Sequence, residues 1–247
     1  MEPATAHGLP LQLWLSYWRM RMRYHRYEVH GLEHLAGPRA ALVVGYHGRP
    51  TAYDMCMLSV AVHRRDGYLP HGIFHKTLGR TPGWGWLIRG LGGLCGDDPR
   101  LPGVVARGEH IITVPGGTRE AYRSFRQRYR VDWGPRTGYL RFAIKYGLPI
   151  VPVGASGVDD VHLGLNDGYR LGKRLGAPAG IPLWLGVGLT GVFPFTAAFP
   201  VKIRQLIGPP ITATVDGLDP ADDAAMAGVH QQVQAAVQGL IDRARAW

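Results

Sequence analysis

The sequence predicts an α/β fold, a single domain with a central mixed, mostly parallel sheet flanked by helices, plus an N-terminal amphipathic helix. Three observations predict it. Short apolar runs of strand length alternate with segments in which apolar residues recur at helical spacing. Such alternation is typical of parallel sheets that are covered by helices. The 247 residues suit one large domain, and no repeat or linker divides them.

Residues 9–27 have the pattern of an amphipathic helix with one apolar and one basic face. Trp beside clustered Arg is typical of helices that lie in a membrane interface. We therefore divide the chain into a membrane-interface helix over 1–27 and an α/β domain over 28–247. The alternative is a helix packed on the domain, with only its basic face in solvent. The apolar face consists of Leu11, Trp14, Leu15, Trp18 and Met22, and the basic side of Arg19, Arg23 and Arg26.

The first half of the domain contains three predicted strands separated by helices. The run AALVVGY at 40–46 is a buried strand that leads into a loop at His47-Gly48. Pro50 can open the next helix, because the N–H that proline lacks has no partner in a first helical turn. The further elements are a helix near 51–63, a strand near 69–75, a helix over 84–90 and a strand over 110–114.

The second half continues the alternation. Residues 137–146 form a predicted helix that Gly147 ends, and an apolar strand follows at 148–153. A late strand is predicted over 201–207. Asp219 and Pro220 are interpreted as the N-cap and first residue of a C-terminal helix. Its apolar side carries Met226, Val229, Val233, Val237, Leu240 and Ile241.

The segment 181–201 comes nearest to a long apolar run and carries no charged residue. Its prolines and glycines break any spanning helix. We interpret it as a loop-rich region that is buried or faces a membrane.

The composition indicates an anionic partner. The chain has 28 basic and 18 acidic residues, and 24 of the basic residues are arginine. Such a surface suits phosphate groups, nucleic acid or an acidic membrane. We find no nucleic-acid motif with interleaved stacking aromatics, so we expect no nucleic-acid partner and regard a membrane as the better one.

His47 and Asp54 are the first candidate site. A histidine lies where a buried strand ends, and an aspartate lies in the first turn of the next helix. A carboxylate there could orient the imidazole and stabilise its charged form, which leaves the other nitrogen as a general base. A surface histidine beside a helix N-terminal aspartate would give the same pattern.

The second candidate site follows the strand at 110–114. A glycine pair lets backbone amides approach an anion closely, and an arginine can form two parallel hydrogen bonds to a phosphate. A simple turn with a solvated basic face is the alternative. The residues are Gly116, Gly117, Thr118, Arg119 and Glu120.

Together these motifs resemble the glycerolipid acyltransferases of the PlsC type, and particularly the branch similar to diacylglycerol acyltransferases. Tyr46-His47 with Asp54 is similar to the first block of that family, His-x4-Asp. The segments 84–93, 114–119 and 148–153 are similar to the second block region, to Phe-Pro-Glu-Gly-Thr-Arg and to the fourth, Val-Pro block. The resemblance covers about residues 27–215.

The chain departs from the family pattern in three places. Six residues separate His47 from Asp54 rather than four, so the loop between them must bulge. Gly116 stands in place of the usual glutamate, and Glu120 is the candidate substitute. The second-block arginine is missing, since Asp97 and Asp98 follow Gly96. Because that block helps bind glycerol phosphate in phospholipid-making members, its loss argues against a lysophosphatidate acceptor.

The resemblance implies acyl transfer from a thioester to a lipid hydroxyl. His47 would take the proton of the acceptor, Asp54 would orient His47, and the 116–120 loop would bind substrate. The implied donor is acyl-CoA as co-substrate, with no other cofactor and no metal. The implied location is peripheral, at the cytoplasmic face of a membrane.

Two other classes of protein remain as alternatives. A non-catalytic basic protein that binds lipids or membranes would share the charge. A metallohydrolase could use several of the 11 histidines, with His71 and His75 joined by His47, Asp54 and His63. Serine hydrolases are disfavoured, because the segment 154–158 lacks the last glycine of G-x-S-x-G.

Overall fold

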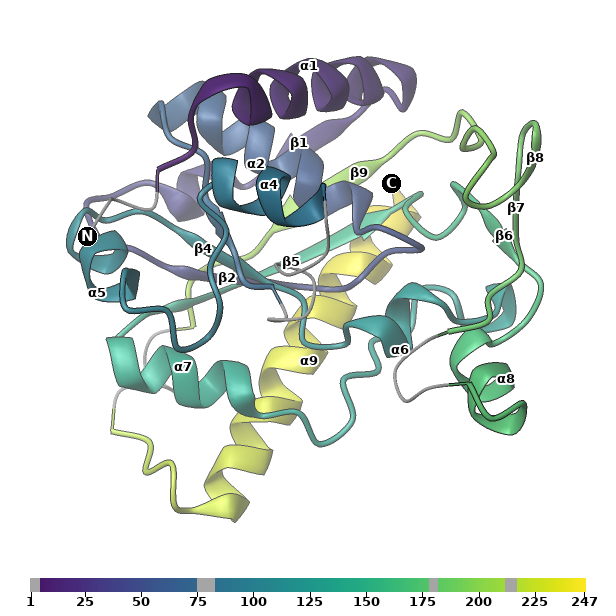
Figure 1. Ribbon diagram of the computed structural model, residues 1–247. Coiled ribbons are helices and arrows are strands. Elements are labelled where there is room, and N and C mark those ends of the chain that lie inside the picture. Colours follow the sequence, from purple (N-terminus) through teal and green to yellow (C-terminus); the bar gives the residue numbers. More distant parts are fainter. Residues whose placement is uncertain (1–4, 75–82, 178–181, 212–216) are drawn as a thin grey trace.

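The computed structural model describes residues 5–74, 83–177, 182–211 and 217–247 (Figure 1). The α-helices are α1 (Gly8–Tyr24), α2 (Tyr53–Asp66), α4 (Trp84–Gly90), α5 (Leu101–Ala106), α6 (Thr118–Ala121), α7 (Gly138–Tyr146), α8 (Gly168–Arg174) and α9 (Asp223–Ala246). Two short 3-10 helices are η1 (Leu32–Leu35) and η2 (Phe125–Gln127). The strands are β1 (Glu28–His30), β2 (Leu42–Gly45), β3 (His71–Gly72), β4 (Ile111–Thr113), β5 (Ile150–Ser156), β6 (Leu163–Gly164), β7 (Gly186–Gly188), β8 (Gly191–Val192) and β9 (Arg204–Ile207).

The main sheet has the strand order β1-β9-β5-β2-β4-β3. The pairs β2–β4, β2–β5, β3–β4 and β1–β9 are parallel, and β5–β9 is antiparallel. The predicted mixed, mostly parallel sheet with flanking helices is therefore confirmed. The prediction for 69–75 reduces to the two residues of β3, and residue 75 lies outside the described part of the chain.

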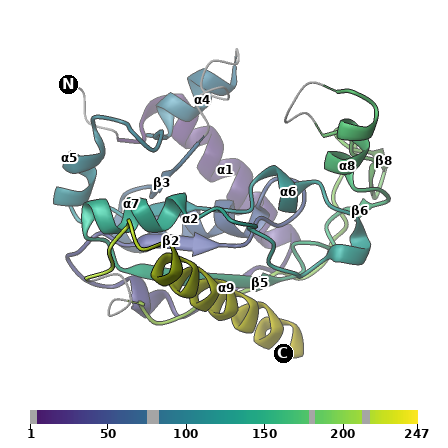
Figure 2. The ribbon, with the colours of Figure 1, turned by 90° about the horizontal axis from the view of Figure 1, so that it is seen from below.

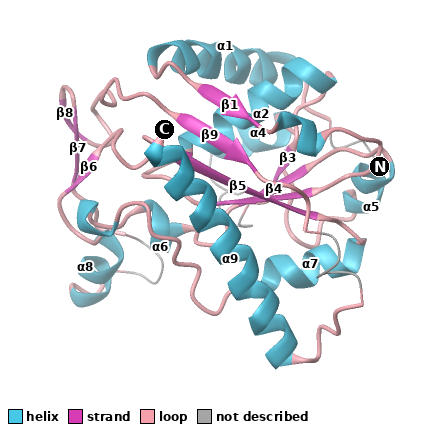
Figure 3. Ribbon diagram, turned by 180° about the vertical axis from the view of Figure 1, so that it is seen from behind, coloured by secondary structure: helices cyan, strands magenta, loops and turns pink. Residues whose placement is uncertain are grey.

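Helices cover both faces of this sheet. Successive residues of a strand point to opposite faces, so neighbouring residues pack against different helices. Val43 of β2 packs in one cluster with Met55 and Leu58 of α2. Its neighbour Leu42 belongs to the cluster that contains the buried residues of α7 and α9. Figure 3 shows α9 crossing β5 and β9. At the crossing, a Cβ on Gly154 would lie 2.6 Å from the backbone N of Ile241, so only glycine lets α9 approach this closely.

A second, smaller sheet has the order β6-β7-β8, and its neighbouring pairs are antiparallel. It lies with α8 at the end of the molecule away from α5 (Figures 1 and 2). The described part of the predicted segment 181–201 forms two of its strands and the loops around them. Many of its apolar side chains are exposed rather than buried: Leu183, Leu185, Leu189, Val192 and Phe195.

The N-terminal helix is confirmed. The prediction that its face with Trp14 and Trp18 is free to contact a membrane is wrong. Trp18 and Leu15 are buried in the core, and the indole N–H of Trp14 donates to the Ser59 hydroxyl at 3.0 Å. The face chosen for lipid therefore packs on α2. The opposite stripe, spaced for one helix face, is exposed: Leu9, Leu13, Tyr17 and Met20.

The C-terminal helix begins later than predicted. Asp222, not Asp219, is its N-cap, and the Asp222 carboxylate accepts from the N–H of Ala225. The Asp219 side chain instead accepts from the N–H of Ala221, in the turn that precedes the helix. Aspartate is favoured both in such turns and at helix N-caps, so its presence alone does not distinguish the two. The predicted apolar side of the helix is buried as expected.

Candidate active site

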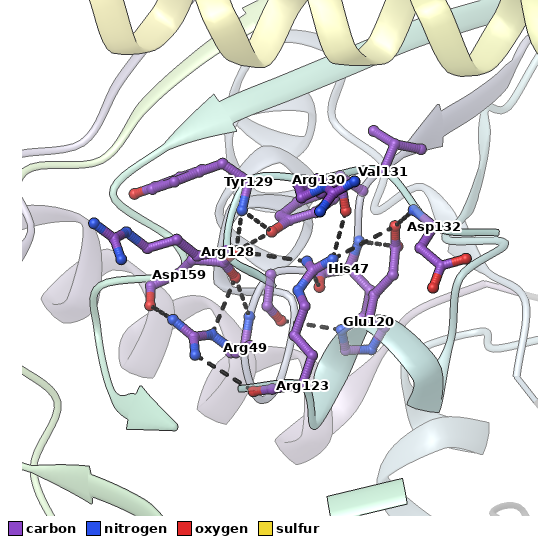
Figure 4. Close-up of polar contacts among 12 residues, drawn as sticks. His47, Arg49, Glu120, Arg123, Arg128, Tyr129, Arg130, Val131, Asp132 and Asp159 are labelled. Carbon is purple, nitrogen blue, oxygen red and sulfur yellow. Dashed lines mark hydrogen bonds and ion pairs between the residues drawn. The ribbon is translucent and has the colours of Figure 1, made fainter. Parts of the chain in front are cut away.

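Three loops meet where neighbouring parallel strands end. β2 pairs with β4 on one side and with β5 on the other, and all three run in the same direction. The loop after β2 carries His47, the loop after β4 leads to Glu120, and the loop after β5 carries Asp159. Figure 4 shows these side chains converging. In open α/β sheets, ligands bind at this carboxyl edge of the strands.

His47 is held as a neutral imidazole with one free nitrogen. Its Nδ1 donates to the Gly48 carbonyl at 3.0 Å, and a carbonyl can only accept, so the ring proton is on Nδ1 and Nε2 keeps its lone pair. Burial, with a smaller contribution from the positive Arg123, lowers the pKa of His47 to about 4. The ring remains partly exposed. These are the properties of a general base at neutral pH.

Asp54 is fully buried in the first turn of α2. Its carboxylate oxygens make no hydrogen bond to any described residue, and therefore none to His47. Oδ1 lies 3.5 Å from the point that a Cβ on Gly48 would occupy, so the carboxylate faces the loop that carries His47. Burial raises the pKa of Asp54 to about 7. In the structure, therefore, Gly48 rather than Asp54 accepts the Nδ1 proton.

Glu120 fastens the His47 loop to the neighbouring loops. It is fully buried, and its two oxygens accept the backbone N–H groups of His47 at 2.9 Å and Asp132 at 2.8 Å. A Cβ on Gly116 would lie 2.0 Å from Glu120 Oε2. The carboxylate of Glu120 thus fills the space beside position 116, which explains why glycine stands there.

The other predicted residues of this loop surround Glu120. Gly117 has φ 50, and Arg136 donates to the Gly116 carbonyl at 2.7 Å. The Gly117 amide donates to the Val114 carbonyl, whereas the amides of Gly116 and Thr118 make no hydrogen bond within the described chain. The guanidinium of Arg119 contacts both oxygens of Asp132 at 3.0 Å and is exposed.

A buried ionic network that the sequence did not reveal connects the loops. Asp159 is fully buried, accepts the phenol of Tyr46 and lies 3.5 Å from guanidinium nitrogens of both Arg49 and Arg123. Arg123 also lies 4.0 Å from Glu120 and stacks over the Tyr46 ring. The available signal for Asp159 was its position just after a buried strand, the position that drew attention to His47.

Two cavities flank this network. The larger, about 540 Å³, is rich in basic side chains, with two carboxylates: Arg119, Arg123, Arg130, Arg170, Lys173, Asp132 and Asp167. The smaller, about 390 Å³, is lined by Arg49, Asp159, His162 and apolar side chains. His47 lines neither of them, but Arg123 of the larger cavity donates to the His47 carbonyl at 3.5 Å, and Arg49 of the smaller cavity follows His47 by two residues.

Of the histidines proposed for a metallohydrolase, His71 is hydrogen-bonded within the protein. Both ring nitrogens of His71 lie at hydrogen-bond distance from acceptors, Nδ1 from the Gly92 carbonyl and Nε2 from the Glu109 carboxylate. His75 lies outside the described residues. Within 5–74, 83–177, 182–211 and 217–247, no three His, Cys, Asp or Glu side chains form a group that could hold a metal ion.

Comparison with known proteins finds a matching family model and several similar chains. Residues 26–156 match the family model described as Acyltransferase. The crystal structure of the 1-acyl-sn-glycerophosphate (LPA) acyltransferase PlsC from Thermotoga maritima aligns with a TM-score of 0.55. The alignment covers 93% of this chain and 78% of that one at 19% identity, so the two chains share a fold.

The curated relatives are longer than this chain. The human DGAT1/2-independent enzyme synthesizing storage lipids is 28% identical over 221 residues, which is 89% of this chain and 62% of the human protein. Its chicken counterpart is 30% identical over 83% of this chain and 57% of its own length. An uncharacterized protein of Mycobacterium tuberculosis is 29% identical over 89% and 62%. The chain thus spans about three fifths of the length of these relatives.

Proposed function

This chain belongs to the acyltransferase family, and we propose that it moves a fatty acyl group from a thioester donor to the hydroxyl of a lipid acceptor. The single observation that carries the proposal is the state of His47. An imidazole whose Nδ1 donates to the Gly48 carbonyl and whose Nε2 is free lies at the carboxyl edge of the sheet, in a segment similar to the first block of the family but with six residues rather than four between His47 and Asp54.

The proposed reaction uses His47 as general base. The acceptor oxygen attacks the thioester carbonyl carbon while Nε2 of His47 takes the hydroxyl proton. The carbon–sulfur bond then breaks, and the thiolate leaves and receives the proton from the imidazolium. Asp54, whose carboxylate faces Gly48, would stabilise that imidazolium. The free amides of Gly116 and Thr118 would stabilise the oxyanion of the tetrahedral intermediate.

The larger cavity suits the phosphates of an acyl-CoA donor, since its basic side chains outnumber its carboxylates. A neutral lipid acceptor fits the printed name of the human relative, an enzyme synthesizing storage lipids. We propose no metal and no cofactor besides this co-substrate. The decisive experiment incubates the purified protein with labelled acyl-CoA and a panel of lipid alcohols, and separates the lipid products. Labelled ester supports the proposal, and hydrolysis or binding without ester contradicts it.

Changing Arg119 to lysine should raise the KM for acyl-CoA about tenfold and leave kcat nearly unchanged. Lysine keeps the charge but loses the planar fork that binds a phosphate through two hydrogen bonds. Steady-state kinetics with the acceptor saturating measures the effect. Arg126→Lys is the matched control, because Arg126 is also exposed but lines neither cavity. A change in melting temperature with an unchanged KM would reduce Arg119 to a partner of Asp132.

The pH profile should reflect the lowered pKa of His47. A base works only when it is unprotonated, and a pKa of about 4 keeps His47 unprotonated well below pH 6.5. The pKa of Asp54 is raised to about 7, so the wild type should also lose the Asp54 charge in this range, and the profile of His47 is measured in the Asp54→Asn variant. In that variant we expect kcat/KM to be nearly constant from about pH 7.5 to 5.5, at whose lower end a histidine of ordinary pKa would be about nine-tenths protonated. Circular dichroism at each pH separates catalysis from unfolding. A midpoint near pH 6.5 in the folded protein would contradict the expectation.

We propose that the protein binds peripherally to an anionic membrane through α1 and α4. None of the described helices has both the length and the apolar composition to cross a bilayer. Leu13 and Met20 of α1 are 50% and 55% exposed, and Trp84 and Trp86 of α4, which packs on α1, are exposed too. Arg19 and Arg23 are exposed on the same helix. Apolar insertion flanked by arginine is typical of interfacial helices, and the cytoplasmic leaflet carries the anionic lipids.

The double change Leu13→Glu and Met20→Glu should release the protein from anionic vesicles without unfolding it, because both side chains are half exposed. Vesicle sedimentation measures binding, and Gln12→Glu, also on an exposed position of α1, is the control. The change Trp14→Glu with Trp18→Glu should instead unfold the protein, since that face is packed on α2. Vesicle binding that survives the Leu13 and Met20 changes would place the contact elsewhere.

A further inference from the structure

We infer that the smaller cavity binds the acceptor, and that the acceptor is an uncharged lipid alcohol. This inference rests on the proposed function and adds to it a second binding site, outside the recognised motifs. The cavity of about 390 Å³ lies between the loop after β5, η2 and Phe199. The residues that carry the argument are His162, Arg49 and the apolar wall formed by Phe125, Leu163 and Phe199.

His162 is the exception among the buried histidines of the described chain. His25, His71, His110 and His230 each have hydrogen-bond partners at both ring nitrogens. His162 is 2% exposed, and neither of its nitrogens has a partner within the described residues. Buried polar groups in native proteins are normally hydrogen-bonded, so an unpaired one requires an explanation. A ligand in the cavity that His162 lines supplies it.

The chemistry of His162 selects the ligand. A neutral imidazole offers one N–H donor and one acceptor nitrogen. A hydroxyl group, which both donates and accepts, or an ester carbonyl beside it, can satisfy either nitrogen. Arg49 is not free in the same way, because its buried Nε makes no hydrogen bond in the described structure but lies 3.5 Å from the Asp159 carboxylate. His162 therefore supplies the unpaired donor and acceptor that an oxygen-bearing ligand would meet.

The charges around the cavity favour an uncharged ligand. Arg49 lies 3.5 Å from Asp159, and Arg128 lies 3.7 Å from Asp160. Each arginine is therefore balanced by a carboxylate. A phosphate would meet both carboxylates without a surplus of positive charge. The larger cavity has that surplus, with five basic side chains to two carboxylates. The two cavities thus divide the substrates, the phosphate-bearing donor in one and the neutral acceptor in the other.

The position of the cavity fits the reaction. Arg49, which lines this cavity, lies two residues after His47 in the same loop, so the cavity borders the loop that carries the proposed base. Apolar side chains continue outward from Leu163, which is 41% exposed, to the exposed Leu165 beyond β6. Acyl chains of a lipid alcohol can therefore lie against β6 while the hydroxyl end reaches inward.

The test measures binding without turnover. Dioctanoylglycerol, a dispersible uncharged lipid alcohol, is titrated calorimetrically into the full chain in the absence of any acyl donor. His162→Phe keeps an aromatic ring against Tyr53 and Phe193 but removes both nitrogens. We expect its Kd for dioctanoylglycerol to rise about tenfold. Its melting temperature should stay the same or rise, because an unpaired buried polar group is removed.

Control variants distinguish a loss of ligand binding at this cavity from misfolding, and acyl transfer is measured separately from binding. Leu163→Glu puts a charge on an exposed position at the cavity, so it should fold and also weaken binding. Lys173→Ala, in the larger cavity, should leave the Kd for dioctanoylglycerol unchanged. A His162→Phe protein that binds like the wild type would overturn the inference, as would preferential binding of lysophosphatidate through His162. If the wild type binds dioctanoylglycerol but transfers no acyl group to any alcohol, the proposed function fails and the binding site stands.

Discussion

Replacing His47 by alanine should lower kcat by about 10²–10⁴-fold, the usual contribution of a positioned general base. The variant should fold normally. Only one hydrogen bond of the ring is lost, to the Gly48 carbonyl, and the backbone N–H that Glu120 accepts remains in place. Ester formation from labelled acyl-CoA and the best acceptor of the panel measures the loss.

The fold of the variant is checked by its melting temperature and by dioctanoylglycerol binding, neither of which involves proton transfer. Asp54→Asn is the informative comparison. It removes the charge that would stabilise the imidazolium but leaves the Nδ1 hydrogen bond to Gly48 intact, so its loss of kcat should be smaller than that of His47→Ala. A His47→Ala protein with near wild-type turnover would remove the catalytic assignment altogether.

The sequence was sufficient to predict the part of the site that depends on buried strands. β2, β4 and β5 are short apolar runs, and each is followed by polar residues that parallel pairing brings to one edge. Parallel pairing thus brings together His47 and Glu120, 73 residues apart, which the sequence placed in two candidate sites that only the family resemblance joined. Asp159 and His162 follow β5 in the same way. They were missed because nothing in their spacing distinguishes them from loop residues.

The N-terminal helix shows a limit of periodicity. α1 has apolar residues on two faces, one with Trp14 and Trp18 and one with Leu13 and Met20. Helical spacing identifies both stripes but does not say which one packs on the domain. The two tryptophans suggested an interface, whereas their size makes them good core residues, and Trp14 can also hydrogen-bond to Ser59.

The small sheet escaped prediction for a different reason. β6 and β8 have two residues each and β7 has three, two of them glycines. Such strands are too short to show the alternation of apolar and polar residues by which a strand is recognised in a sequence. Their pairing depends on contacts far apart in the sequence, such as Leu163 opposite Val187.

Changing Gly116 to alanine should destabilise the protein by about 2–4 kcal/mol and abolish most activity. The new Cβ would lie 2.0 Å from Oε2 and 2.1 Å from Cδ of Glu120, so the carboxylate must move. Because both of its oxygens accept backbone N–H groups, moving it breaks the part-buried hydrogen bonds that hold the His47 and Asp132 loops together. Chemical denaturation measures the stability, and Gly138→Ala is the control, since nothing lies within 4 Å of a Cβ built there.

A double-mutant cycle identifies Glu120 as the cause. Glu120→Ala alone should cost about 3–5 kcal/mol, because it removes the acceptor of two part-buried backbone amides and one of the two carboxylates near the buried Arg123. In that background Gly116→Ala has nothing to displace, so the two costs should be far from additive. The exchange variant, Gly116→Glu with Glu120→Gly, returns a carboxylate to the same space from the other position. It should recover part of both stability and activity, whereas additive losses and an inactive exchange variant would show that position 116 acts independently of Glu120.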